Sequence, residues 1–174
     1  GNSEAMLISL HEHGILSQVA GETTTWRLHH LMGEFLEQIA SCLRPPDQII
    51  RIRRRASAFL ESKGDMDRAL EQLAASADWP GMAALIKRHG DRYFLQIGRL
   101  DALRSWLGRL PGEVVSGDPW LMYFQGVSIL HGHPAEALDT LSRATDTAEK
   151  KGDLKCQLRT LFLMIAAHTF ANNL

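Results

Sequence analysis

A run of arginines is the densest group of side chains in this sequence that could bind a charged ligand. The run consists of Arg51, Arg53, Arg54 and Arg55. A guanidinium donates paired hydrogen bonds to carboxylates and phosphates, so these residue types favour recognition of an anion. Arg88 follows Arg54 by 34 residues, and Arg92 comes one helical turn later. We predict that Arg54, Arg88 and Arg92 bind a carboxylate, a phosphate or an acidic peptide; the alternative is a solvated basic face.

Histidine and cysteine offer no comparable site. His11 and His13 are two residues apart, so on a helix their side chains point about 200° apart and cannot share a metal ion. Cys42 and Cys156 lie far apart and have no CxxC or Cys/His ligand spacing. No GxSxG turn for a serine nucleophile occurs. We therefore predict no catalytic, metal-binding or cofactor-binding residues in this chain, and no enzymatic activity.

The composition is that of a water-soluble globular protein. Hydrophobic residues make up 45% of the 174 residues and charged residues 22%, and the formal net charge is −1. Such a balance gives no overall field that would attract nucleic acid or an anionic membrane. No apolar run approaches the roughly 20 residues that span a bilayer, and no signal sequence is recognisable. With only two cysteines, we expect a reducing, cytoplasmic location and no membrane partner.

The first part of the chain reads as helix, strand, strand, helix. Residues 15–19 and 23–28 are rich in β-prone side chains and flank a turn-like segment at residues 20–22. Apolar residues then recur at helical spacing from Leu31 to Leu43, and two prolines end the pattern. We interpret residues 1–44 as the C-terminal part of a winged-helix domain with a short β-hairpin.

Glycines set the organisation of residues 47–174. Gly64, Gly98 and Gly132 are separated by two intervals of 34 residues, the period of tetratricopeptide repeats. Five and nine residues after each glycine come a small or apolar residue and a larger one. The sets are Gly64/Ala69/Leu73, Gly98/Leu103/Leu107 and Gly132/Ala137/Leu141. We predict an all-α fold, a right-handed tetratricopeptide-like array of antiparallel helix pairs that turn at these three glycines.

The first helix of each predicted pair matches the repeat less well. Eleven residues before each glycine, where the repeat prefers a buried aromatic side chain, stand Arg53, Lys87 and Leu121. The helix that carries the arginine run is expected to bury Ile49, Ile52, Ala56, Phe59 and Leu60. Leu154, Leu158, Leu161 and Ile165 recur at helical spacing and predict a final helix. The repeats are therefore degenerate.

Several segments together resemble one family. Residues 26–36 (WRLHHLMGEFL) resemble the segment that ends the winged helix of MalT-like, ATP-dependent transcriptional activators of the LuxR family. Residues 54–60, 67–70 and 77–79 are similar to the helices that follow in that family, and residues 100–107 and 132–138 continue the likeness. The resemblance covers essentially the whole chain.

The resemblance implies a role in regulation. Such activators contain a nucleotide-binding domain, a winged helix, a helical-repeat sensor and a C-terminal helix-turn-helix. This chain has no GxxxxGK[ST] phosphate loop and no DNA-reading unit, so ATP and DNA binding are expected in other parts of a larger parent protein. The expected partners are a small-molecule inducer or a regulatory protein on the repeats, and flanking domains of the same chain. The alternative is a tetratricopeptide scaffold without any DNA or nucleotide role.

Overall fold

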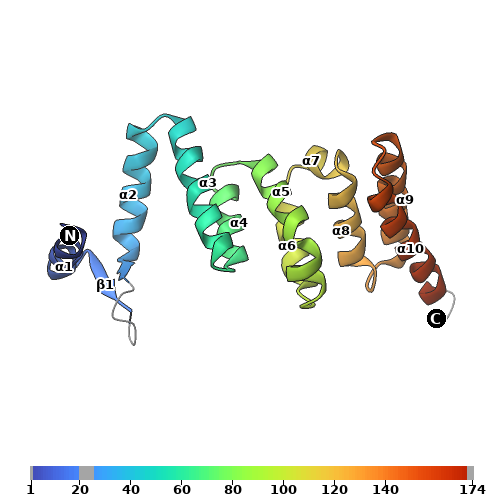
Figure 1. Cartoon of the computed structure of the whole chain (residues 1–174), viewed down its shortest axis with the longest axis horizontal. Helices are drawn as coiled ribbons and strands as arrows, with labels where there is room; N and C mark the ends of the chain where they lie inside the picture. Colours follow the sequence, from blue (N-terminus) through green and yellow to red (C-terminus); the bar gives the residue numbers. More distant parts are fainter. Residues whose placement is uncertain (1, 20–25, 172–174) are drawn as a thin grey trace. The chain divides into compact units, whose positions relative to one another are not determined.

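The computed structural model describes residues 2–19 and 26–171 of the chain (Figure 1). Helices dominate the described residues, and one antiparallel pair of short strands is the only sheet among them. This confirms the predicted mostly helical fold with two short strands near the start. Within the described part, no helix is both long and apolar enough to cross a membrane. The chain divides into two compact units, Gly1–Arg51 and Ile52–Leu174.

The first unit contains two helices and the strand pair. Its elements are α1 (Asn2–Glu12), β1 (Leu16–Gln18), β2 (Trp26–Leu28) and α2 (His30–Leu43). Gly14 ends the first helix in a left-handed conformation, with a φ of 70°, which a residue without Cβ adopts at no steric cost. The strands pair antiparallel with Ser17 opposite Arg27. The predicted hairpin turn at residues 20–22 lies outside the described residues.

Apolar side chains of α2 are exposed to solvent. The helical periodicity correctly predicts the helix, but Leu31 is 60% exposed and Phe35 is 55% exposed. Leu43, near the end of the helix, is also exposed. The spacing predicts which face of the helix is apolar. It does not show whether another part of the protein covers that face. The winged-helix interpretation therefore stays a prediction.

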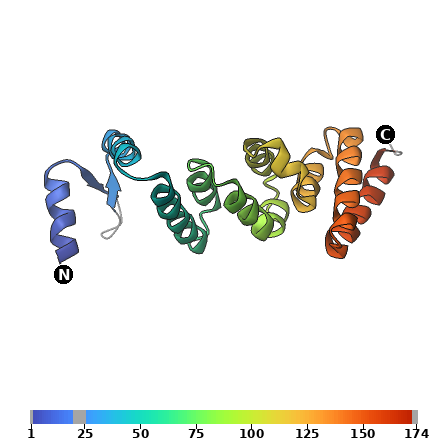
Figure 2. The same ribbon diagram turned by 90° about the horizontal axis from the view of Figure 1, so that it is seen from above.

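The second unit consists of helices alone among its described residues. A long helix, α3 (Pro46–Ser62), leads into it from the first unit. The elements that follow are α4 (Met66–Ala74), α5 (Trp79–His89), the π-helical segment η1 (Gly90–Leu95), α6 (Leu100–Arg109), α7 (Gly112–Ser116), α8 (Pro119–Ile129), α9 (Pro134–Lys150) and α10 (Leu154–Ala171). Consecutive helices pack together, α4 on α5, α8 on α9 and α9 on α10 (Figure 2). The shared core runs from α4 to α10.

The three spaced glycines lie between helices. Gly64, with a φ of 79°, separates α3 from α4, and Gly98, with a φ of 76°, separates η1 from α6. Gly132 separates α8 from α9. The turn between α4 and α5 is comparable but has an alanine in place of glycine, and this residue, Ala77, adopts a φ of 51°. The left-handed conformation is thus needed at several helix ends, and glycine occupies most of them.

The second helix of each predicted pair, α4, α6 and α9, buries the residues that the 34-residue spacing selects. Ala69, Leu103 and Ala137 are fully buried. The larger residues four positions further on, Leu73, Leu107 and Leu141, are also buried. These positions agree with the predicted register, while the tetratricopeptide architecture as a whole stays a prediction.

The predicted apolar face of α3 is wrong in part, and the apolar residues of α10 do not form its buried face. In α3 the buried residue is Ser57, whereas Phe59 is 61% exposed and Ile52 is 48% exposed. The spacing of Leu154, Leu158, Leu161 and Ile165 correctly predicts helix α10, but all four side chains are exposed. Cys156, Thr160 and Ala167 are fully buried instead, because this face of α10 packs against α8 and α9. Small side chains allow a close helix contact, and the larger apolar residues then point away from it.

Candidate functional site

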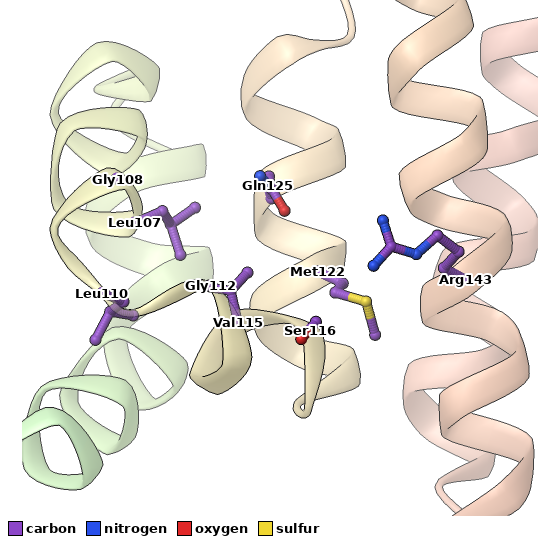
Figure 3. Close-up of a pocket in the computed structure, with 9 residues that line it drawn as sticks. All are labelled: Leu107, Gly108, Leu110, Gly112, Val115, Ser116, Met122, Gln125 and Arg143. Atoms are coloured by element: carbon purple, nitrogen blue, oxygen red, sulfur yellow. The ribbon is translucent and has the colours of Figure 1, made fainter.

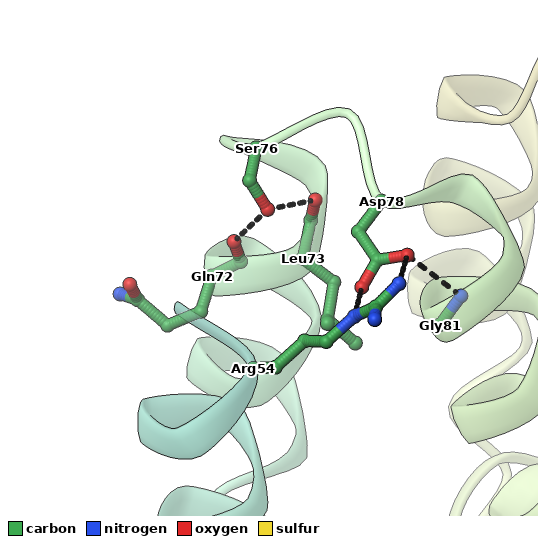
Figure 4. Close-up of polar contacts among 6 residues, drawn as sticks. All are labelled: Arg54, Gln72, Leu73, Ser76, Asp78 and Gly81. Atoms are coloured by element: carbon green, nitrogen blue, oxygen red, sulfur yellow. Dashed lines mark hydrogen bonds and ion pairs between the residues drawn. The ribbon is translucent and has the colours of Figure 1, made fainter. Parts of the chain in front are cut away.

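The predicted binding residue Arg54 is engaged inside the protein. Its guanidinium reaches from α3 to Asp78, which stands directly before α5 (Figure 4). Nε donates to one carboxylate oxygen of Asp78 and Nη2 donates to the other at 2.8 Å. This is the paired geometry that makes arginine–carboxylate contacts specific. The group that could bind an external anion therefore already holds an internal one.

Asp78 joins two kinds of contact at one carboxylate. Besides binding Arg54, Asp78 caps α5 by accepting a hydrogen bond from the backbone N–H of Gly81 at 3.2 Å. Its side chain is 2% exposed, while that of Arg54 is 57% exposed. The hydrogen bond from Arg54 holds the pKa of Asp78 below its ordinary value against the effect of burial, and the Gly81 amide lowers it further. The carboxylate therefore stays ionised although it is buried.

Arg88 is also bound to a carboxylate of the chain. Its Nη1 donates to Glu61 on α3 at 2.6 Å, and the Nε2–H of the neighbouring His89 donates to the same oxygen at 2.7 Å. The hydrogen bond from His89 is the largest cause of the lowered pKa of Glu61, and Arg88 adds to it. Arg54 and Arg88 thus connect α3 to α5 at two places, and we call these contacts the α3–α5 clasps.

Arg92 differs from the other two predicted residues. It lies on the π-helical segment η1 and is exposed. Among the described residues, no ion pair or hydrogen bond of its guanidinium is found. The structure therefore does not bring Arg54, Arg88 and Arg92 together as one row of free cations. Only Arg92 has a charged end available for a partner without first breaking an internal contact.

A similar arrangement recurs further along the helical unit. Asp118 caps α8 and binds the ammonium group of Lys87 from α5. Asp153 accepts from the backbone N–H of Cys156 at the start of α10, and its other oxygen accepts from the indole N–H of Trp120 on α8 at 2.7 Å. Each of these aspartates precedes the first helix of a predicted pair and binds a side chain of the preceding first helix. We therefore interpret the capping aspartates as the polar links between successive pairs.

A cavity lies where α6, α7, α8 and α9 meet. Its volume is about 310 Å³. Leu107, Leu110, Val115 and Met122 are buried and form its apolar part, and Gln125 and Arg143 line its exposed rim (Figure 3). The sequence gives no local signal for this cavity, because its walls come from four helices whose residues are distant in sequence.

The remaining reactive residue types form no assembled site in the described part of the chain. No group of three or more histidines, cysteines or carboxylates that could hold a metal ion occurs among the described residues. Cys156 is fully buried, and burial raises the pKa of its thiol to about 11. A thiol with this pKa is protonated at neutral pH and is a poor nucleophile.

The chain is distantly similar to a known transcriptional regulator. The chain is 29% identical over 122 residues to the HTH-type transcriptional regulator MalT of Vibrio cholerae. These residues are 70% of this chain but only 13% of the regulator, so the chain corresponds to a small part of that protein. The chain matches no protein-family model and no solved structure.

Proposed function

We propose that this chain is the non-catalytic, effector-sensing and protein-interaction region of a MalT-like transcriptional regulator of the LuxR family. The observation that carries the proposal is the similarity to MalT over 122 residues. This stretch is more than twice as long as the first unit, Gly1–Arg51, so most of it lies in the helical unit. The proposal therefore concerns mainly the packed helices of residues 52–174.

The helical unit has features that suit a sensor built from tetratricopeptide-like pairs. Stacked repeats present equivalent positions as a continuous surface, and each pair is held mainly by its neighbours. The capping aspartates Asp78, Asp118 and Asp153 link successive first helices, so a ligand that moves one helix also strains the next contact. This continuity supports a role in passing a binding event to flanking domains.

The proposal assigns the remaining activities to other parts of the parent protein. ATP binding and promoter DNA binding would belong to a nucleotide-binding domain and a helix-turn-helix outside this chain, and the site of action would be the cytoplasm. The first unit would be the end of a winged helix that connects to the sensor. Within this chain, an effector or a regulatory protein would bind the helical unit.

A tetratricopeptide scaffold without any DNA or nucleotide role is the alternative. The two proposals differ in the rest of the parent gene. A phosphate-binding loop before this segment and a helix-turn-helix after it support the regulator. If the flanking sequence encodes neither, the regulator proposal is refuted and the scaffold remains.

The sensing role can be tested in the full parent protein. We expect Arg92→Glu to reduce the transcriptional response to an anionic partner while promoter binding in vitro is unchanged. Arg92 is the appropriate residue, because Arg88→Glu would place a second carboxylate beside Glu61 and destabilise the α3–α5 clasps. Arg55→Glu is the matched control, since Arg55 is exposed on α3 and lies outside the set Arg54, Arg88 and Arg92.

The measurement is transcript level from the regulated promoter at low and high effector. A response that is unchanged by Arg92→Glu and by deletion of residues 52–174 would contradict a sensing role. A response lost on deletion but kept in Arg92→Glu would locate the partner elsewhere on the helical unit. Binding of an anionic partner to Arg92 should also weaken as salt rises, because exposed charges are screened over about 10 Å at 0.1 M ionic strength.

A further inference from the structure

The cavity beside α8 combines an apolar wall with a single charged group. Leu107, Val115 and Met122 are each less than a tenth exposed and face the cavity. Arg143 on α9 is the one charged residue among those that line it, and its guanidinium points from α9 toward α8 (Figure 3). Apolar walls with a few placed polar groups are typical of small-molecule sites. This pairing selects for a ligand that has both an apolar part and a negative charge.

Arg143 is not occupied by the protein itself. Other arginines of the helical unit have carboxylate partners, as Arg54 has Asp78 and Arg159 has Asp91. No ion pair or hydrogen bond of the Arg143 guanidinium is found within the described ranges, although its backbone carbonyl accepts from Thr147. Its charge is therefore available to an external anion.

Two exposed glycines line the mouth of the cavity. Gly108 lies near the end of α6 and Gly112 begins α7, and both line the cavity. Neither has a φ in the left-handed region, and a Cβ added to either would meet no atom within 4 Å. The space beside both glycines is therefore open, and a larger side chain at either position would lie at the mouth of the cavity.

We propose that this cavity binds a small amphipathic carboxylate. Arg143 holds the carboxylate, Gln125 offers an amide N–H beside it, and the apolar body of the ligand packs on Leu107, Val115 and Met122. The volume of about 310 Å³ is at the lower end of the range for ligand pockets, so the ligand is smaller than a nucleotide or an oligosaccharide. This proposal rests on the sensing role proposed above, and it names small amphipathic carboxylates as the class of effector.

Octanoate is a suitable probe because it combines a short alkyl chain with one carboxylate. Octylamine and octanol are the matched controls, and octyl phosphate separates a carboxylate site from a general anion site. In calorimetric titrations of the complete chain octanoate should bind. In thermal unfolding it should raise the melting temperature, and the rise should grow with the logarithm of its concentration once that concentration exceeds the Kd. Octylamine and octanol should bind at least tenfold more weakly, roughly the factor that a charge-assisted hydrogen bond contributes.

Variants locate the binding within the molecule. Arg143→Gln should weaken octanoate binding by roughly tenfold or more and leave octanol unchanged. Gly108→Leu should fill the cavity and abolish binding of both, whereas Gly108→Ala should leave most of the space open and retain binding. Arg109→Gln is a surface control that should have no effect on any titration. Circular dichroism of each variant checks that the helices remain folded.

Four outcomes would overturn the proposal. Equal binding of octanoate and octylamine, or unchanged binding in Arg143→Gln, would show attachment to exposed apolar side chains elsewhere. Full binding in a folded Gly108→Leu variant would exclude the cavity. If octyl phosphate binds more tightly than octanoate, the site prefers a phosphate ligand and the proposed carboxylate is wrong. A failed titration refutes only this ligand class, whereas a parent gene without a helix-turn-helix refutes the regulator.

Discussion

Two helix contacts in the same unit are stabilised in different ways. The α3–α5 contact depends on polar clasps, in which Arg54 binds Asp78 and Glu61 binds Arg88 and His89. The arginine side chains of these clasps are more than half exposed to solvent. The α8–α9 contact has a different composition, since it is formed by small residues that bring two helix backbones together.

The α8–α9 contact leaves no room for larger side chains. A Cβ built on Gly126 of α8 would lie 2.7 Å from the side chain of Leu141 on α9. Ala137 and Ala144 of the same helix are fully buried. Close packing of this kind loses stability when volume is added, whereas an exposed ion pair contributes little because water screens it. Mutations should therefore affect the two contacts unequally.

The largest effect is expected where volume is added to the packed contact. Ala137→Phe should lower the free energy of unfolding by about 1–3 kcal/mol, because the ring must displace α8 or α9. Chemical denaturation measures the change. Ala135→Phe is the matched control on the same helix, since Ala135 is exposed, and it should change stability little. Equal stability of Ala137→Phe and the wild type would show that the two helices do not pack as described.

Removing the central carboxylate of the α3–α5 contact should have the next largest effect. Asp78→Ala eliminates the cap of α5 as well as the partner of Arg54, and loss of an N-cap costs about 1 kcal/mol. Asp78→Asn separates the two roles, because asparagine can also cap a helix but carries no charge. We expect Asp78→Asn to retain most of the stability in urea denaturation. If both variants are equally destabilised, the charge and not the cap stabilises this contact.

Sequence reasoning could predict the packed contact better than the clasps. Ala137 and Leu141 follow Gly132 at fixed spacing, so a local pattern identifies them. Arg54 and Asp78 are 24 residues apart, and no local signal reveals that they meet. The same limit explains Arg143, whose cavity depends on four helices. Periodicity also misplaced the buried face of α3, where Ser57 is buried and Phe59 is exposed.

A pH titration should distinguish the two contacts without any mutation. The pKa values of Asp78 and Glu61 are lowered in the folded protein, so both carboxylates bind protons more readily when the chain is unfolded. Their contribution is complete above the unfolded values of about 4 and is lost as pH falls through the lower folded values. The free energy of unfolding should therefore decrease below about pH 4.

The matched variant for this titration is Arg54→Gln. Without Arg54 the largest cause of the lowered Asp78 pKa is absent, so the decrease in stability at acid pH should be smaller than in the wild type. Ala137→Phe should lower the curve at every pH without altering its slope, since no titratable group takes part in that contact. An unchanged acid slope in Arg54→Gln would mean that Asp78 does not contribute to it.

The smallest expected effect concerns the turn that leads into the clasped helix α5. Ala77 has a φ of 51°, a left-handed conformation that costs an L-residue about 1–2 kcal/mol. Ala77→Gly removes this strain but increases the freedom of the unfolded chain, which offsets about 0.4–1 kcal/mol. The net result should be a gain between about 0 and 1.6 kcal/mol, measurable as a rise in the denaturation midpoint. Gly64→Ala at the equivalent left-handed end of α3 is the reverse experiment and should reduce stability by a similar amount. If Ala77→Gly destabilises the protein, the alanine methyl makes a contact that outweighs the backbone strain. The turn at Ala77, like the neighbouring Asp78, would then stabilise the start of α5.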